Sequence, residues 1–199
     1  MRLLSIFLFF SVFLYAEDNY SLRFVYGEAS TNDLGQIITG DFGTHPKDLS
    51  VVSIDGGYLL SKDVFDIPLD IYLKGGFSYF SEDTHDDVYE SLIYIKFFYN
   101  LDFWQNRVRV GFGEGVSYAS DVLECEHDEA LEKNDHTSKF LNYLDISFDF
   151  DFGKLVRYKP LYGTYIGYLI KHRSGIFGLI NDVKHGGSNY NSIYIEKNF

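Results

Sequence analysis

The sequence contains few of the residues that form disulfides or interrupt helices and strands, with one cysteine and three prolines in 199 residues. Because Cys125 stands alone, no internal disulfide can form, and we interpret it as an incidental loop residue. Basic residues are also scarce: 17 Lys and Arg stand against 29 Asp and Glu, a formal net charge of −12. This balance argues against a nucleic-acid partner, because phosphate binding depends on clustered Lys and Arg.

The first sixteen residues differ in kind from the rest of the chain. The positive Arg2 precedes the apolar run Leu3–Tyr15, after which the chain turns polar at Glu17. This run is shorter than the roughly 20 residues of a membrane-spanning helix, so it predicts a cleavable signal peptide over residues 1–16. No cysteine follows the run to serve as a lipid attachment point. We therefore expect one mature domain over residues 17–199.

Alternation of apolar and polar residues at a period of two is the main local signal after the signal peptide. Eighteen glycines and 19% aromatic residues suit an all-β protein better than a helical one. No stretch predicts an amphipathic helix of ordinary length. Each predicted strand has about the length of a tilted transmembrane strand, roughly 9–11 residues. The strands are expected at 19–29, 48–60, 67–80, 87–101, 107–120, 138–152, 159–174 and 189–199.

The connections between these strands alternate in length, as in bacterial outer-membrane barrels. Those at 61–66, 102–106 and 153–158 are short, whereas the others are mostly longer. Both termini then lie on the periplasmic side, and the chain ends on Phe199, like the terminal aromatic strand of such barrels. We predict an eight-stranded antiparallel, up-and-down transmembrane β-barrel in the bacterial outer membrane. A soluble barrel of lipocalin type, with its apolar face inward, is the alternative fold.

The two faces of the predicted sheet can be assigned from parity. In strand 138–152, apolar side chains such as Phe148 oppose Asp145 and Asp149, and strand 107–120 places glycines opposite its apolar set. The apolar face must meet lipid, because an uncovered sheet with a charged opposite face needs an apolar solvent outside. Small inward residues indicate a barrel too narrow for a diffusion pore. A salt-bridged interior is expected from Arg23, Arg107 and Arg109 with Asp145, Asp149 and Asp151.

Many acidic residues fall in the expected loops, notably 82–87 and the run Asp121–Asp135. We interpret them as solvated; a sharper hypothesis is that they bind the divalent cations that bridge lipopolysaccharide phosphates. Possible metal ligands crowd one loop between Glu126 and His136, but their spacing matches no structural zinc motif. We therefore assign no metal site, and no cofactor is predicted.

Five polar residues interrupt the predicted lipid-facing side. His172 and Ser174 continue the outward parity of the penultimate strand, so they lie side by side on one face. Glu114, Asn142 and Asn189 lie on neighbouring strands at a similar height. A charge on this face costs about 2–4 kcal/mol at mid-bilayer and little near the interface, so a polar patch at the outer-leaflet rim is predicted. A histidine beside a serine is the minimum for nucleophilic acyl chemistry, with the imidazole as general base.

The C-terminal segment resembles the lipid A 3-O-deacylases of the PagL type. The likeness lies in His172-Arg173-Ser174-Gly175, followed by Gly178, Asn181-Asp182, Gly186-Gly187 and a last strand. It covers mainly residues 160–199, roughly a fifth of the chain. The resemblance implies an outer-membrane barrel with a Ser-His-Glu triad on its outer surface, which hydrolyses the ester-linked acyl chain at the 3 position of lipid A. It also implies Ser174 as the nucleophile and His172 as the base.

Two positions depart from the pattern of that family. The family has Asn after the serine, where its backbone helps to form the oxyanion hole, and this chain has Gly175, whose amide can still donate. The acid of the family lies early in the last strand, where this chain has Asn189. Asn189 can orient the histidine; the alternative is Glu114, about 10 Å away at two strand spacings, with Asn142 as a bridge. Gly175, Asn142 and Asn189 are candidates for the oxyanion hole or for positioning the substrate.

The leading hypothesis is a serine esterase that acts on lipid A, with lipopolysaccharide as its partner and no cofactor. The alternative is a non-enzymatic barrel for envelope integrity or adhesion, in which Lys171, His172 and Arg173 reach toward lipopolysaccharide phosphates. A monomer or weak dimer is expected in either case.

Overall fold

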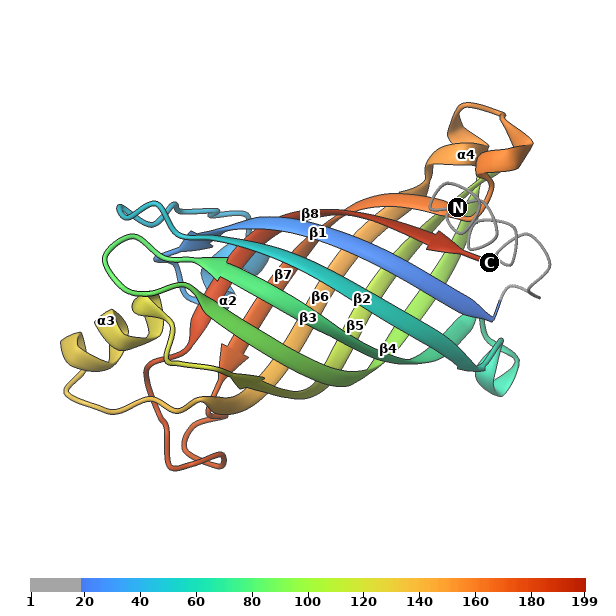
Figure 1. The fold of residues 1–199 in the computed structure, drawn as a ribbon. Coiled ribbons are helices and arrows are strands. Elements are labelled where there is room, and N and C mark those ends of the chain that lie inside the picture. The colour runs from blue at the N-terminus through green and yellow to red at the C-terminus, as the bar shows by residue number, and fades with distance from the viewer. Residues whose placement is uncertain (1–18) are drawn as a thin grey trace, which may run out of the picture.

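The structure is a computed structural model that describes residues 19–199, so the predicted signal peptide at 1–16 lies outside the described residues. Eight antiparallel strands form a closed barrel in which each strand pairs with its neighbours in sequence and β8 closes on β1 (Figure 1). This confirms the predicted fold. The strands are β1 (Tyr20–Ser30), β2 (Ser50–Ser61), β3 (Leu69–Ser81), β4 (Val88–Phe103), β5 (Asn106–Ala119), β6 (Phe140–Asp151), β7 (Thr164–Ser174) and β8 (Ser188–Asn198).

Short helices lie only in the connections of the described chain. They are α2 (Leu34–Ile38), η1 (Val64–Asp66), α3 (Glu124–Glu132), α4 (Phe152–Leu155) and η2 (Lys159–Leu161). None of these helices is long and apolar enough to cross a membrane. We call the end of the barrel at which β1 begins and β8 ends the periplasmic end, and the opposite end, which carries α3, the extracellular end (Figure 1).

The predicted start of the seventh strand at residue 159 is wrong, because β7 begins at Thr164. The turn before it is built as two short helices, and Pro160 lies within the second. Asp151 caps this turn by accepting hydrogen bonds from the amides of Lys154 at 2.9 Å and Gly163 at 3.0 Å. Because Asp151 is used in this way, it does not pair with an arginine of the interior as the sequence led us to expect.

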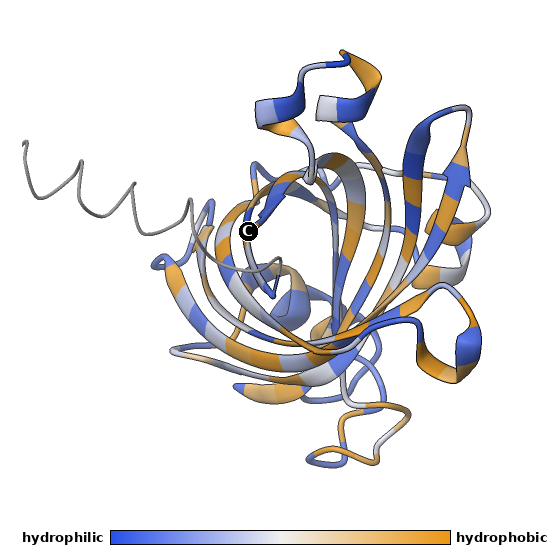
Figure 2. Cartoon of the chain, turned by 90° about the vertical axis from the view of Figure 1, so that its right-hand side faces the viewer, coloured by the Kyte–Doolittle hydropathy of each residue, from blue (hydrophilic) through white to orange (hydrophobic). Residues whose placement is uncertain are grey.

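The two faces of the barrel follow the predicted parity. Figure 2 shows hydrophobic and hydrophilic residues alternating along the strands. Apolar side chains are well exposed on the outer face, which is the face that a bilayer would cover. Examples from six strands are Phe24, Val52, Phe77, Phe112, Phe148 and Ile193.

The interior is filled by fully buried ion pairs. Arg23 donates to Asp145 at 2.7 Å and to Asp55, and Lys96 bonds to the same Asp145. Arg109 pairs with Asp149 at 2.8 Å, which confirms this part of the predicted core. Buried charges are tolerated only when they are paired in this way.

The ion pairs of Arg107 and Glu196 differ from those that the sequence predicted for the interior. Arg107 pairs with Asp102 near the periplasmic rim instead of joining the core. The further core acid is Glu196 of β8, which accepts from Lys74 and lies 3.2 Å from Arg109. Its carboxylate therefore ties the closing strand to the network, which the sequence pattern did not suggest.

The extracellular end holds buried acids where we expected solvated ones. Glu124 and Glu126 of α3 are fully buried. Burial alone would raise the pKa of Glu124, but hydrogen bonds from Lys47 and Thr84 outweigh it and hold that pKa well below its usual range. Burial raises the pKa of Glu126 to about 7, against the opposing charge of Arg173. The interpretation of this loop as uniformly solvated is therefore wrong.

Cys125 is also part of the packing at this end. It is 8% exposed and belongs to a buried cluster with Leu123, Phe80 and Tyr190. This cluster closes the barrel beneath α3, so Cys125 is a core residue and not an incidental loop residue. Burial raises the pKa of its thiol, which keeps it protonated and unreactive.

Candidate functional site

A groove on the outside of the barrel, at the extracellular end, contains every predicted site residue. Its volume is about 620 Å³. The walls come from the β1–β2 loop, from α3 and from the β7–β8 loop. Its base includes Glu114, Asn142, Leu144, His172, Ser174, Gly175 and Asn189, which belong to or follow four neighbouring strands.

The strand register explains why these residues meet. Asn142 of β6 lies opposite Ser174 of β7, and His172 lies opposite Asn189 of β8. Glu114 of β5 lies opposite the β6 residue that faces His172. Directly opposed residues project to the same face of a sheet. The outward parity assigned from the sequence therefore puts all five side chains on one patch of the outer wall.

His172 is held in one tautomer by the residue opposite to it. Its Nδ1 lies 2.8 Å from Oδ1 of Asn189, and Nδ2 of Asn189 donates to the carbonyl oxygen of Asn32 at 3.1 Å. A carbonyl oxygen can only accept, so the NH₂ group of Asn189 must face Asn32 and its oxygen must face the ring. Nδ1 of His172 then carries the proton and donates it, which leaves Nε2 as the basic nitrogen.

Glu114 contacts Asn142 and makes no hydrogen bond to His172 within the described chain. Nδ2 of Asn142 donates both to Glu114 and to the carbonyl oxygen of Gly115, the latter at 2.9 Å. Both amide hydrogens are thus in use. Asn142 is 5% exposed, so it fixes the floor of the groove beside Ser174 rather than offering a donor to a substrate. The histidine is oriented by Asn189 and not by Glu114.

Gly175 replaces the asparagine of the resembled family for a packing reason. A Cβ at this position would lie 2.0 Å from the carbonyl oxygen of Val183 and 2.6 Å from its Cβ. Val183 is buried, with 1% of its surface exposed, so it cannot move aside cheaply. Because Val183 of the β7–β8 loop lies so close to this position, only glycine fits after Ser174.

Ser174 is half-buried and is not engaged with the base. Within residues 19–199, Ser174 and His172 make no hydrogen bond to one another. Their outward positions two residues apart on β7 place them side by side. Catalytic hydrogen bonds commonly tighten only when a substrate binds, so the missing hydrogen bond does not remove this pair as a candidate.

The β1–β2 loop covers the outer face of β7 and β8 next to the groove, which the sequence did not predict. The ring of Phe42 packs against Tyr168, with centroids 5.4 Å apart. Nδ2 of Asn191 donates to the carbonyl oxygen of Phe42 at 3.2 Å. Ile170, which has outward parity, is only 4% exposed. A signal for this contact was present, because Asn191 and Asn189 are two outward asparagines on one strand.

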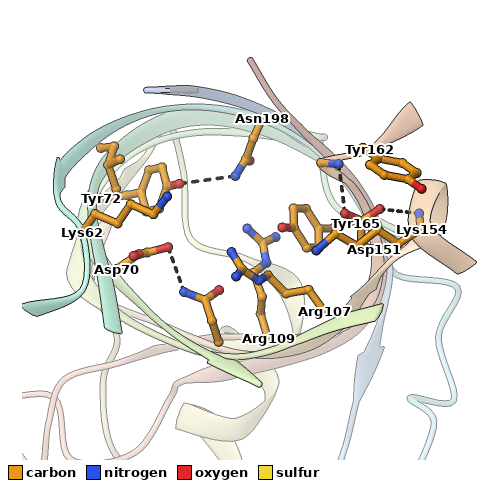
Figure 3. A pocket seen from close by; sticks show the side chains of 13 residues that line it. Lys62, Asp70, Tyr72, Arg107, Arg109, Asp151, Lys154, Tyr162, Tyr165 and Asn198 are labelled. Carbon is orange, nitrogen blue, oxygen red and sulfur yellow. Dashed lines mark hydrogen bonds between the residues drawn. The ribbon is translucent and has the colours of Figure 1, made fainter. Parts of the chain in front are cut away.

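A second hollow, of about 340 Å³, opens at the periplasmic mouth of the barrel and is drawn in Figure 3. Arg109 and Tyr165 lie at its floor, and the guanidinium of Arg109 stacks on the ring of Tyr165 at 3.4 Å. Asp70 accepts a hydrogen bond from Asn100 at 2.8 Å. The polar groups here are mostly engaged with one another, and no serine, cysteine or histidine lines the hollow. The hollow therefore lacks a serine and histidine pair like the one that lines the outer groove.

Comparison with known protein families and with curated proteins gives no match for this chain. Two crystal structures are similar to it in fold. The outer membrane enzyme PagL is similar at a TM-score of 0.62 and 14% identity, over 90% of this chain and 99% of that chain. Neisserial surface protein A (NspA) is similar at a TM-score of 0.51 and 13% identity, over 92% of this chain and 98% of that chain.

These similarities show the fold. The chain is an eight-stranded barrel of the kind found in outer-membrane proteins, and both neighbours span it almost end to end. One neighbour is described as an enzyme and the other as a surface protein. The barrel is thus compatible with either kind of role, and the chemistry of the groove has to decide between them.

The acidic loop that we considered for metal binding does not gather its side chains. Within the described residues, no group of three or more His, Cys, Asp or Glu side chains is arranged to hold a metal ion. Glu126 points inward, 3.2 Å from Arg173, and His136 contacts Asp135 and the carbonyl oxygen of Asn181. These residues stabilise the loops.

Proposed function

We propose that this chain is a serine esterase of the bacterial outer membrane that removes an ester-linked acyl chain from lipid A. The observation that carries the proposal is the tautomer of His172, whose Nε2 is left basic beside Ser174. Both residues lie in a groove on the outer wall, where a lipid can reach them laterally. The PagL fold neighbour is an outer membrane enzyme, which is consistent with this assignment.

The reaction follows from these groups. Nε2 of His172 takes the proton of the Ser174 hydroxyl as its oxygen attacks the ester carbonyl carbon. The same proton then passes to the departing sugar hydroxyl, which leaves the fatty acyl group on Ser174. A water molecule, deprotonated by His172, hydrolyses that acyl ester and releases a fatty acid. The backbone amide of Gly175 is the donor that remains for the oxyanion, since the amides of Asn142 and Asn189 are both occupied.

Because Asn189 and not a carboxylate orients His172, we expect a low rate of ester hydrolysis. The Asn189 oxygen orients the ring as a carboxylate would, but it carries no charge to stabilise the imidazolium that forms during attack. We therefore propose a slow esterase whose geometry is set by Asn189. Glu114, held by Asn142 on the far side of Ser174, does not supply the missing charge to the ring.

The test is mass spectrometry of lipid A from cells that express the wild type, Ser174→Ala or Ser61→Ala at equal membrane levels. Ser61 is an exposed serine at the periplasmic end of β2 and serves as the matched control. We expect the loss of one ester-linked acyl chain with the wild type and with Ser61→Ala, and intact lipid A with Ser174→Ala. Intact lipid A in all three strains would overturn the proposal.

The alternative is a non-enzymatic barrel that serves envelope integrity or adhesion. Within the described residues, it is favoured by the missing hydrogen bond between His172 and Ser174 and by the absence of a carboxylate that bonds to the ring. The NspA neighbour shows that the fold also occurs in a surface protein. Envelope phenotypes that are identical for the wild type and Ser174→Ala, with unmodified lipid A in both, would support this function instead.

A further inference from the structure

The segment 175–183, which we call the arm, leaves the barrel wall at the extracellular end. It forms the first half of the β7–β8 connection and leans sideways, at the lower left of Figure 1. In Figure 2 the same loop, at the bottom, is largely hydrophobic in colour. The arm therefore carries apolar side chains away from the barrel at the level of the groove.

The arm has a fixed conformation. The amide of Gly178 donates to the carbonyl oxygen of Val183 at 2.9 Å, and the amide of Ile180 donates to that of Gly175 at 2.9 Å. The side chain of Asn181 donates to the carbonyl oxygen of Phe140 at 2.8 Å, which ties the arm to β6. These bonds make the arm part of the barrel wall rather than a loose loop.

Strain is stored at the bend of the arm. Ile176, Phe177 and Gly178 follow one another in the left-handed region, with φ of 49°, 55° and 93°. For a β-branched residue such as Ile176 this region is a clear outlier. The bend turns Phe177 away from the barrel.

The exposed tip of the arm consists of two apolar side chains. Phe177 is 94% exposed and Leu179 is 82% exposed. Such side chains are costly in water and favourable in hydrocarbon. Phe177 and its neighbour Ile176 also line the groove that contains Ser174. Ile176 and Phe177 therefore connect the tip of the arm with the groove that contains the candidate nucleophile.

We propose that the arm inserts Phe177 and Leu179 among the acyl chains of the outer leaflet and steers one acyl chain along Ile176 to Ser174. The steering half of this inference rests on the proposed esterase function. Acyl chains are the occupant that the position favours, because the arm is tied to Phe140, a residue of the outward apolar face. The same bilayer that covers this face reaches the tip of the arm.

The kinetic test compares two substrates on the purified full-length protein. One is a short, water-soluble ester such as p-nitrophenyl acetate, and the other is lipid A presented in vesicles. We expect Phe177→Ser to lower kcat/KM for lipid A about tenfold, the effect of losing one buried aromatic contact, and to leave the soluble ester within twofold. Equal effects on both substrates, or no effect on lipid A, would overturn the steering.

Phe65 supplies a matched control variant. It lies in η1 at the other end of the barrel, is 89% exposed, and has φ of 59°, close to that of Phe177. Phe65→Ser therefore removes the same side chain from the same backbone conformation, far from the groove. It should leave both rates unchanged, which separates steering from a general loss of membrane anchoring.

Insertion of the arm can be tested without activity. Phe177→Trp, made together with Trp104→Phe to remove the single native tryptophan, places a fluorophore at the tip. Lipids brominated on their acyl chains should quench it, relative to unbrominated lipids, and an unquenched signal would overturn insertion. Quenching without any Ser174-dependent hydrolysis of either ester would overturn the proposed function and the steering together, while insertion of the arm would stand.

Discussion

The two sides of β7 place polar residues in opposite surroundings. On the inner side, Lys171 donates to Glu90 at 2.6 Å and Arg173 lies 3.2 Å from Glu126. On the outer side, the described residues give His172 only neutral partners, the side-chain amide of Asn189 and the backbone of Ser188, and Ser174 makes no hydrogen bond to the ring. Residues 171–174 thus alternate between contacts with buried carboxyl groups on the inner side and neutral contacts on the outer side.

The difference shows what each side is for. A charge inside the barrel must be paired, because removing one partner leaves a buried charge uncompensated. The inner residues therefore contribute to stability. Polar groups on the outer wall are costly against lipid and do not close the barrel. Their presence there, in a groove and with a defined tautomer, is better explained by chemistry than by folding.

The variant with the largest expected effect alters the inner side of β7. Glu90→Ala removes the carboxylate that faces both Lys171 and Arg173. We expect it to lower the free energy of unfolding by about 3–5 kcal/mol, as for other broken buried pairs. Urea unfolding of the barrel in phospholipid vesicles measures this. A loss below about 1 kcal/mol would mean that water reaches these charges and that the inner side is not sealed.

The counterpart on the outer side is His172→Ala. The rate of lipid A deacylation should fall by about 10²–10⁴, the usual contribution of a general base. The free energy of unfolding should change by only about 1 kcal/mol, since one hydrogen bond to Asn189 is lost. The same vesicle unfolding assay and the lipid A assay give the two values. A large stability loss with activity retained would reverse the roles assigned to the two sides.

The stability of the extracellular end around Arg173 is expected to depend on pH. Glu126, its partner, has a pKa raised to about 7 by burial, above the usual value near 4.5. Folding thus favours the protonated carboxyl, so its contribution is full below about pH 4.5 and is lost as the pH rises through 7. We expect a stability loss on the order of 1–3 kcal/mol over this range. Glu126→Gln should remove it, which thermal unfolding at pH 5 and pH 8 would detect.

Glu124, two residues before Glu126, gives the opposite sign. Its folded pKa is lowered by the hydrogen bonds from Lys47 and Thr84, so its contribution is present above pH 4.5 and is lost as the pH falls below that value. Glu124→Gln should therefore weaken the fold most near neutral pH and less at pH 3. A wild-type protein whose stability does not change between pH 3 and pH 8 would contradict both assignments.

The smallest expected effect is an increase in kcat. Asn189→Asp restores a carboxylate next to Nδ1 of His172, where it would stabilise the imidazolium. The gain is limited, because one carboxylate oxygen would then face the carbonyl oxygen of Asn32 in place of an amide hydrogen. We expect kcat to rise about tenfold, measured in vesicles beside Asn189→Leu, which should lower it. A rise with Glu114→Gln instead would contradict the assignment of Asn189.

The barrel and the outer patch were predictable because a period of two fixes which side chains share a face. Parity alone placed His172, Ser174, Asn142, Glu114 and Asn189 together. The register then showed what parity could not, that Asn189 and not Glu114 meets the ring. Which of two candidates, one strand and two strands away from the histidine, makes contact depends on shear, and shear leaves no local trace in the sequence.

Long-range contacts of the loops were not predictable. The packing of Phe42 on Tyr168 joins residues far apart in the chain, with no periodic signal in the loop. The helix α3 was missed because its first turn is acidic and its burial depends on partners from other loops, such as Lys47 for Glu124. A run of acids is typical of solvent-exposed chain, and only the tertiary partners reverse that expectation.

The β1–β2 loop makes the groove one-sided. With Phe42 on Tyr168, and with Asn32 and Phe42 bonded to Asn189 and Asn191, the wall over β8 is shielded by protein. The flank over β5 and β6 carries no such cover, as the exposed Phe112 and Phe148 show. For the proposed esterase, a lipid would therefore reach the groove from the side of β5 and β6, and the product would leave by the same route.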